Sequence, residues 1–584
     1  MTDTPRSQLK KAIVSDDRNE IVRLLEGSGE LRDSLDDPMF EWSKPPLAGA
    51  RSIETAELLH RHGADYAKVG EWWAPGFFVR SVDPAVGRFL AEHGAQLTPH
   101  SAAGLGLTDE LSAMLDADPA VIDAKGGDAC TPLHFARDIP TAKLLIDRGA
   151  RLDARDEDHD STPAQWLIGD APEVAKYLLE RGATPDIFLA AALGDRALCE
   201  RLIEANPAVL ALRVGTAPFH PIGYQNLGGT ILQWTLGFNS FAHQYAAAKG
   251  HDELVRYLFD ESDAKTQFLA ACVMAMRPEA EAIAAANPDL VGSLTDEDLE
   301  LLARYCWETN ANVEAVRLML DVGFPIDHPE TRHGWMPLHN AAWGGYGDLV
   351  DLLIERGHPL DLRDPGFGGT PIGWAIHCCC NEGRHPEGEY GRVVGALIDA
   401  GCPWDPPIYP TGDSRIDEAF EPRLRRRIDG AALLGDAEAV EGFLATTSAP
   451  ATLTLALIGA AKGAHIAIVE RLLAAGARIN PEPQGTWSPI HAAAASGSVE
   501  TLELLISRGA DVTALNGHGS TALHFAAATG NGLPVLRALL RHGAGKAINV
   551  VNRYKQTPLD VSIEAGNEEA AEWLRENGGS KAEA

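Results

Sequence analysis

The densest group of metal-binding side chains in this sequence is a single short stretch containing His377, Cys378, Cys379, Cys380 and His385. Thiolates and imidazoles are the usual zinc ligands, and four of them complete a tetrahedral site. Three consecutive cysteines converge poorly on one ion, because a helix turns each side chain about 100° from the one before it. The eight cysteines of the chain follow neither a zinc pattern nor a disulfide pattern. The sequence therefore predicts small buried thiols here, with no bound metal and no cofactor.

Enzymatic motifs are the next place to look for chemistry. The sequence contains no G-x-S-x-G, G-K-S/T, H-E-x-x-H or Rossmann glycine motif, so it points to no catalytic residue. The acids Asp156, Glu157, Asp158 and Asp160 fall in a turn, where we expect them to be solvated. An alternative stays open: an enzyme or small-ligand binder with its site at an insertion, in 216–240 or 333–390. That site would gather one of two sets of side chains: His220, Tyr224 and His243, or His333, His339, His377 and His385.

Aromatic residues recur at matching positions of the chain and suggest a binding surface. One in-phase position holds Phe135, Trp166, Trp234, Trp374 and Phe525, and a position three residues further along holds Trp343 and His377. Trp and Tyr dominate binding hot spots because they bury a large area at low entropic cost. In the alternative interpretation, these rings only fill gaps between adjacent helices. The candidate partner-binding residues are Trp335, Trp343, Tyr346, Phe367, Trp374, His377, Trp234 and Trp166.

The elements that must position these residues follow from an internal repeat. A leucine-rich helix end followed by Gly recurs at steps of 33 or 34 residues, as from Gly149 to Gly182 and from Gly476 to Gly509. A start signal precedes it, most clearly as Thr131-Pro132-Leu133-His134. Thr caps the first amides of a helix, and Pro fits the first helical position. We expect the His to be structural, with its ring bonded to the backbone of the adjacent turn.

A period near 33, T-P-L-H starts and L-L-x-x-G-A ends together resemble the ankyrin repeat family, here in a divergent form of many repeats. The abundance of Ala, Arg and Gly also gives the chain a bacterial appearance. The resemblance implies an all-α fold, an ankyrin-type α-solenoid of about 17 helix-pair repeats with short hairpin loops. It also implies that the first helices and hairpins line a concave surface on which a protein partner binds.

The repeat signal is interrupted most strongly at 402–428, a stretch with five prolines. We therefore expect an N-terminal ankyrin repeat array over 1–401, a Pro-rich irregular insertion or linker over 402–428, and a C-terminal array over 429–584. Repeat arrays tolerate insertions because each unit contacts only its neighbours.

The net charge of the chain limits the kinds of partner that we expect. The formal charge is −33, which disfavours nucleic acid and favours a protein partner with a basic patch. We expect Arg423, Arg425, Arg426 and Arg427, the one basic cluster, either to form a solvated face or to pair with local acids. No targeting segment or membrane span is visible. The sequence therefore predicts a cytoplasmic protein-protein interaction scaffold of unknown oligomeric state.

Overall fold

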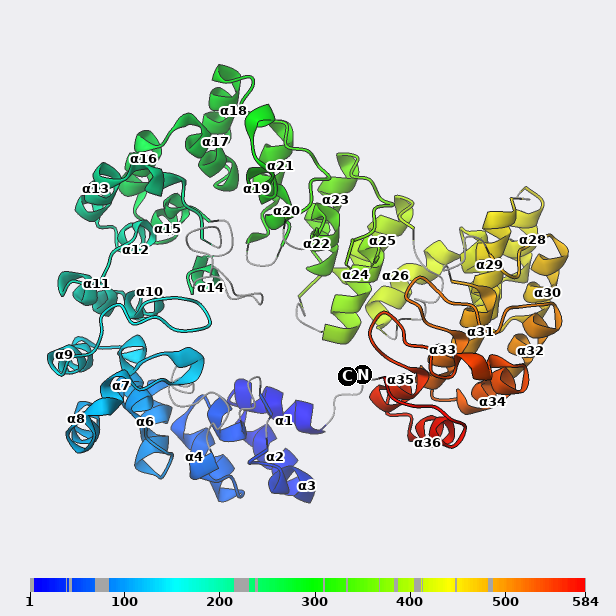
Figure 1. Ribbon diagram of the computed structural model, residues 1–584, viewed down its shortest axis with the longest axis horizontal. Helices are drawn as coiled ribbons and strands as arrows, with labels where there is room; N and C mark the ends of the chain where they lie inside the picture. Colours follow the sequence, from blue (N-terminus) through cyan, green and yellow to red (C-terminus); the bar gives the residue numbers. More distant parts are fainter. Residues whose placement is uncertain are drawn as a thin grey trace. The chain divides into compact units, whose positions relative to one another are not determined.

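The computed structural model divides into two compact units, Met1–Tyr305 with Glu314–Phe324 and Cys306–Val313 with Pro325–Ala584 (Figure 1). The structure describes residues 5–37, 39–40, 45–68, 83–214, 231–236, 240–307, 310–331, 334–366, 368–382, 387–403, 411, 413–446, 449–481 and 487–582. Within these ranges the elements are helices, and β structure is limited to isolated bridge residues: Arg213 pairs antiparallel with Phe241, and Phe40 also lies in a bridge. The predicted all-α solenoid of helix pairs is confirmed.

The helices form pairs, and in most pairs a short first helix precedes a longer second helix. In the first unit they are α1 (Pro5–Val14), α2 (Arg18–Gly27), α3 (Gly29–Asp33), η1 (Pro46–Gly49), α4 (Ile53–Arg61), α6 (Pro84–Glu92), α7 (Pro99–Leu105), α8 (Thr108–Ala117), η5 (Pro132–Phe135), α9 (Ile139–Asp147), α10 (Pro163–Leu167), α11 (Pro172–Glu180), α12 (Ile187–Ala192), α13 (Arg196–Ala205), α14 (Gln233–Leu236), α15 (Ala242–Ala248), α16 (Asp252–Glu261), α17 (Ala264–Val273), α18 (Arg277–Ala286), α19 (Asp296–Leu299), α20 (Leu301–Arg304) and α21 (Val313–Asp321).

The second unit continues the alternation. Its helices are α22 (Pro337–Trp343), α23 (Gly347–Glu355), α24 (Pro371–His377), α25 (Tyr390–Asp399), α26 (Ser414–Leu424), α27 (Ile428–Leu434), α28 (Ala437–Leu444), α29 (Pro450–Lys462), α30 (Ile466–Ala474), α31 (Pro489–Ser496), α32 (Val499–Ser507), α33 (Ala522–Ala528), α34 (Leu533–Arg541), α35 (Pro558–Glu564) and α36 (Glu568–Glu576). Among the residues described in both units, no helix is long and apolar enough to cross a lipid bilayer.

The start signal works as a reciprocal cap. The Thr131 N–H donates to His134 Nδ1 at 2.9 Å, and His134 Nε2 lies 3.3 Å from the carbonyl oxygen of Ser161 in the next hairpin. His491 and His524 repeat this arrangement. Gln165 replaces the histidine in one repeat, accepting from the Thr162 N–H at 2.9 Å. The histidine is therefore structural, as predicted, and an amide can take its place.

These buried histidines predict a loss of stability in acid. Burial lowers the pKa of His491 from 6.5 to about 4, against weaker raising effects that include Asp511. Because the folded-state pKa lies below the unfolded one, the stability that the neutral histidine contributes is complete above pH 6.5. This contribution is lost as the pH falls toward 4, since the unfolded state takes up the proton first. Urea unfolding at pH 7.5, 6 and 5 should show this loss, about 1–3 kcal/mol per such histidine. His491→Gln, which copies Gln165, should flatten the pH dependence. An equal pH dependence in both proteins would contradict this explanation.

First helices pack on first helices and second helices on second helices within each unit. In the second unit, α27, α29, α31, α33 and α35 form one such row. Alanine and glycine let these helices approach closely: Ala431, Ala460, Ala493 and Ala526 are fully buried. A Cβ atom on Gly459 of α29 would clash with the carbonyl oxygen of Asp429 in α27. The small side chains of the first helices therefore set the spacing of the repeats.

Substitution of Gly459 tests that spacing. Gly459→Ala is expected to cost about 1–3 kcal/mol of stability, because the clash is with backbone that has no other rotamer to adopt. Gly442 of α28 is the matched control: a Cβ atom there meets nothing within 4 Å. Gly442→Ala should raise the stability by about 0.5–1 kcal/mol, since alanine favours the helix. Thermal unfolding measures the change in stability of each variant relative to the wild type. Equal changes in the two variants would rule out close packing at Gly459.

The range 402–428 is more regular than predicted. Its described part contains α26, on which Ile416, Phe420 and Leu424 are fully buried, and α26 packs against α25 and α27. The prolines concealed a helix whose apolar residues recur at a spacing of four. The basic cluster pairs locally, as predicted: Arg423 and Arg426 with Asp399, Arg425 with Glu421 and Asp436, and Arg427 with Asp429.

Candidate partner-binding surface

Four indole rings gather in the second unit. Trp335 precedes α22, Trp343 ends it and Trp374 lies on α24, while Trp307 belongs to the short segment of this unit that precedes α21. Ring centroids are 4.9 Å apart for Trp307 and Trp335, 5.8 Å for Trp307 and Trp343, and 5.5 Å for Trp343 and Trp374. His377 contacts Trp343 at 5.8 Å. We call these five residues the tryptophan cluster.

Trp374 anchors the cluster from the interior. It is 6% exposed, and its indole Nε1 donates to Asp364 Oδ2 at 3.0 Å. Asp364 is 1% exposed and also accepts from the Gly369 N–H at 2.6 Å, which closes the hairpin before α24. This ring therefore fills a gap between repeats, the alternative that the sequence left open.

The other indoles of the cluster are only half-buried. Trp307, Trp335 and Trp343 each keep part of the ring in solvent, and His377 is exposed. The Trp343 backbone is held by Tyr390, whose hydroxyl donates to the Trp343 carbonyl oxygen at 2.8 Å. Among the described residues, the Nε1 donor of Trp343 meets no acceptor. These three residues thus leave part of their surface exposed, while the Nε1 atom of Trp343 is itself buried.

A shallow groove adjoins Trp343. It has a volume of about 410 Å³ and is lined by the Gly344–Leu349 turn and by Glu387, Gly388 and Glu389. Tyr346 is half-buried and lines this groove. Gly345, with φ +68°, lies so close to the Gly388 backbone that a side chain would not fit. Arg392 neutralises part of the nearby acid by pairing with Asp348, Asp351 and Glu389.

The remaining predicted site residues lie apart from this cluster. Trp166, in the first unit, is 3% exposed and packs against His159 and Phe135. Trp234, also in the first unit, is 69% exposed. Phe367 lies outside the described residues. The structure therefore brings together Trp335, Trp343, Trp374 and His377, and places Tyr346 beside them.

Sequence reasoning missed Trp307 and Asp364. Trp307 follows a repeat that starts at Thr295 without the proline of the signal, so it could not be aligned with the other rings. Asp364 belongs to a hairpin position that recurs as Asp156, Asn516 and Asn552, where each side chain accepts backbone N–H groups. A hairpin alignment of Asp and Asn would have identified it.

Two of the histidines proposed for an enzyme site, His243 and His339, are buried and bonded within the fold, while His377 is exposed. His339 Nε2 lies 3.1 Å from the carbonyl oxygen of Gly369, and His243 Nε2 lies 3.1 Å from Ser262 Oγ. Burial lowers the pKa of each to about 4. His220, Tyr224, His333 and His385 lie outside the described residues. The described members of the two histidine sets do not converge on one pocket.

The cysteine run continues α24 as one turn of π-helix, Cys378–Glu382. Cys378 is buried beside the Tyr390 hydroxyl, at 3.3 Å, while Cys379 receives a hydrogen bond from Arg415 at 3.0 Å. Burial, with the nearby Asp413, raises the pKa of the Cys379 thiol to about 12. The raised pKa disfavours the thiolate form of Cys379, and Cys378 is buried.

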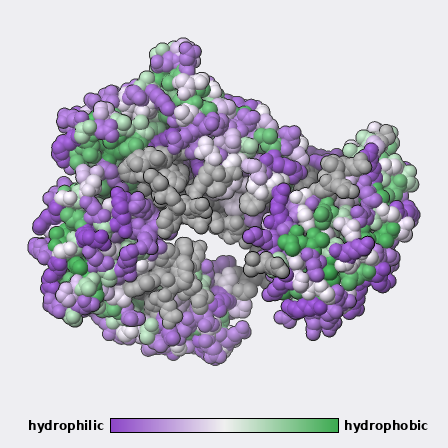
Figure 2. Space-filling view, in the orientation of Figure 1, coloured by the Kyte–Doolittle hydropathy of each residue, from purple (hydrophilic) through white to green (hydrophobic). Residues whose placement is uncertain are grey.

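Hydrophilic residues dominate the visible face in Figure 2, with hydrophobic residues in scattered groups. The formal charge of −33 is that of the whole chain.

Comparison with known proteins identifies the repeat. Residues 302–354, 457–506 and 490–540 match the family described as ankyrin repeats (many copies). SH3 and multiple ankyrin repeat domains protein 2 of Homo sapiens is 38% identical over 39% of this chain and 11% of its own length. Ankyrin repeat and KH domain-containing protein mask-1 of Caenorhabditis elegans is 28% identical over 43% and 9%. Protein phosphatase 1 regulatory subunit 27 of Mus musculus is 36% identical over 10% and 44%.

These matches cover small parts of the relatives. The chain spans about a tenth of the length of the first two, so they identify the repeat and not a shared whole-protein activity. The three relatives come from animals, and the bacterial appearance of the composition finds no support in them.

Proposed function

Because this chain is an ankyrin repeat protein, we propose that it is a cytoplasmic interaction scaffold that binds a protein partner on the tryptophan cluster. Ankyrin repeats are the feature it shares with SH3 and multiple ankyrin repeat domains protein 2, and another relative is named as a regulatory subunit of protein phosphatase 1. The compartment is part of the proposal and rests on the cysteine pattern, which fits a reducing environment.

One observation carries the proposal: Trp307, Trp335 and Trp343 expose indole area side by side, while Trp374 alone is sealed into the core. Half-exposed rings on a rigid backbone lose little entropy when a partner covers them.

The neighbouring groove suggests the chemistry of the partner. Glu387, Glu389 and Asp348 are exposed along it, and Arg392 is the positive charge that faces them. A partner segment with an apolar side chain for the indoles and a basic side chain for the groove would complement this surface. Complementary charge of this kind raises the association rate and makes binding sensitive to salt.

The experiment is affinity capture with the tagged full chain from an extract of the source cells, followed by mass spectrometry. Trp335→Ala with Trp343→Ala is the test variant, and Trp487→Ala is its matched control. Trp487 also precedes a start signal and is also half-buried, against Phe525 at 4.5 Å. We expect a protein captured by the wild type and the control but not by the double variant. Identical captured sets from all three chains would contradict the proposal.

A further inference from the structure

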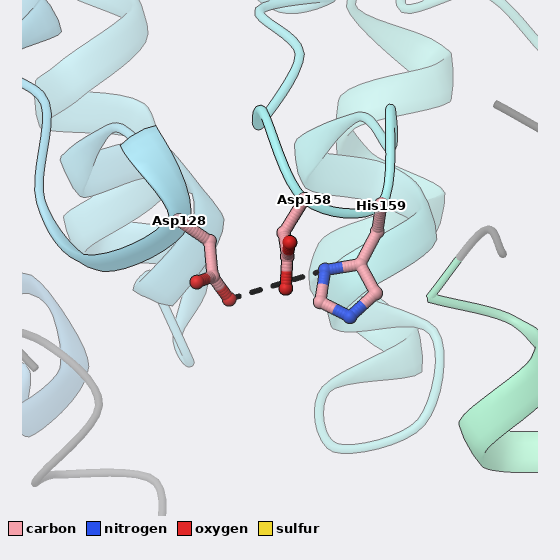
Figure 3. Close-up of side chains that lie close together, drawn as sticks. All are labelled: Asp128, Asp158 and His159. Atoms are coloured by element: carbon pink, nitrogen blue, oxygen red, sulfur yellow. Dashed lines mark ion pairs between the residues drawn. The ribbon is translucent and has the colours of Figure 1, made fainter. Parts of the chain in front are cut away.

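Two successive hairpins of the first unit bring three metal-binding side chains together. Asp128 comes from the first hairpin, and Asp158 and His159 from the next (Figure 3). One ligand atom from each residue lies within 4.8 Å of the others. The two hairpins are tied by a hydrogen bond from the Glu157 N–H to the Asp128 carbonyl oxygen at 2.7 Å. The backbone therefore fixes the spacing of the three side chains.

The Asp128 carboxylate is buried without a donor. Its side chain is 7% exposed, and among the described residues no group donates a hydrogen bond to it. The nearest charged atom is His159 Nδ1 at 3.9 Å, which lies closer to Asp156 Oδ2, at 3.0 Å. In Figure 3 the carboxylate points toward His159 and Asp158. A carboxylate with so little exposed area normally accepts hydrogen bonds or binds a cation, and the described residues give Asp128 only the His159 ring as a partner.

Asp156 has a different role from its neighbours. It is buried and accepts the N–H groups of Ser161, at 2.6 Å, and of His159, at 2.8 Å. The expectation that all four acids of this turn are solvated was thus wrong for Asp156, because the Asp156 carboxylate accepts backbone N–H groups that hold the hairpin together. Its second contact is with the His159 ring, where Nδ1 donates to Asp156 Oδ2 at 3.0 Å. This contact fixes the orientation of the imidazole and leaves Nε2 as the ring nitrogen that can coordinate an ion.

We propose that Asp128, Asp158 and His159 bind a divalent transition-metal ion of the zinc class. Two carboxylates and one imidazole form a mixed oxygen and nitrogen set, which suits zinc and its neighbours better than magnesium or calcium. The ion would neutralise the two carboxylates that face each other here. Trp166 and Trp234 flank the His159 ring, at 5.2 and 6.5 Å between ring centroids. They supply the apolar wall that such sites commonly have.

Calorimetric titration of the chelator-treated full chain with zinc chloride tests this site. The chain has 20 histidines and 8 cysteines, so the informative quantity is the difference between variants. We expect the wild type to bind one more equivalent of zinc tightly than Asp128→Asn or Asp158→Asn does. Any zinc that either variant still binds at this site should be held at least 100-fold more weakly. Asp160→Asn is the matched control, since Asp160 lies in the same hairpin but is exposed and paired with Arg155. It should bind zinc as the wild type does.

Thermal unfolding provides the second readout. Without zinc, Asp128→Asn should melt at or above the wild-type temperature, because it removes an uncompensated buried charge. With zinc, the wild type and Asp160→Asn should gain stability and Asp128→Asn should gain none. If Asp128→Asn does not fold, Asp158→Asn decides the question alone. Equal zinc stoichiometry in the wild type and the folded variants would overturn the site, as would binding of calcium in preference to zinc.

Discussion

Alanine at both Trp335 and Trp343 is expected to weaken binding of the captured partner by about 30- to 1000-fold. Truncation of a central aromatic hot spot typically costs 2–4 kcal/mol, and each 1.4 kcal/mol is a factor of ten. Both residues are partly exposed, so part of their apolar area remains available to a partner. Isothermal titration of the purified partner into each variant of the full chain measures the effect.

The control separates binding from folding. Trp487→Ala removes a ring with the same exposure and the same position before a start signal, so it should cost a similar, small amount of stability. It should leave the affinity within about threefold of the wild type. If the double variant loses its cooperative melt along with its affinity, the rings belong to the core and the binding surface lies elsewhere.

Trp374→Ala is expected to have the largest effect on stability, a loss of about 3–5 kcal/mol. The ring is 6% exposed, and its removal would leave both a cavity and the buried Asp364 carboxylate without its indole donor. Urea unfolding followed by circular dichroism measures this loss. Because Trp335 and Trp343 pack against this ring, we expect Trp374→Ala to lose partner affinity only to the extent that it loses stability.

Trp374→Phe refines the same prediction. Phenylalanine fills most of the cavity but cannot donate to Asp364, so the loss should shrink to about 1–3 kcal/mol, the cost of an unsatisfied buried acceptor. A Trp374→Ala variant as stable as the wild type would mean that this ring is not part of the core.

The fold was predictable because its signals are local and repeated. Thr131 and His134 cap the same helix whose start they mark in the sequence. The close packing at Gly459 follows from the Ala- and Gly-rich composition of the first helices. Stacking such units then has one solution, in which each pair buries its apolar face against the next. Helix α26 was missed because the prolines around it were read as breakers, although Ile416, Phe420 and Leu424 carried the helical spacing.

The surface was only partly predictable, because exposure depends on neighbours far along the chain. Position alone placed Trp343 and Trp374 in one row, but the burial of Trp374 depends on Asp364 and the hairpin that it closes. Trp307 and Trp335 meet although 28 positions separate them. Likewise, the turn around Asp158 looked solvated until the preceding hairpin brought Asp128 against it.

Oxidative footprinting of tryptophan side chains, with and without the purified partner, tests the proposed binding surface most directly. Trp307, Trp335 and Trp343 should lose most of their reactivity in the complex, while Trp234 and Trp487 keep theirs and Trp374 reacts in neither state. Protection at Trp234 or Trp487 with the three cluster rings unchanged would contradict the assignment of partner binding to the tryptophan cluster.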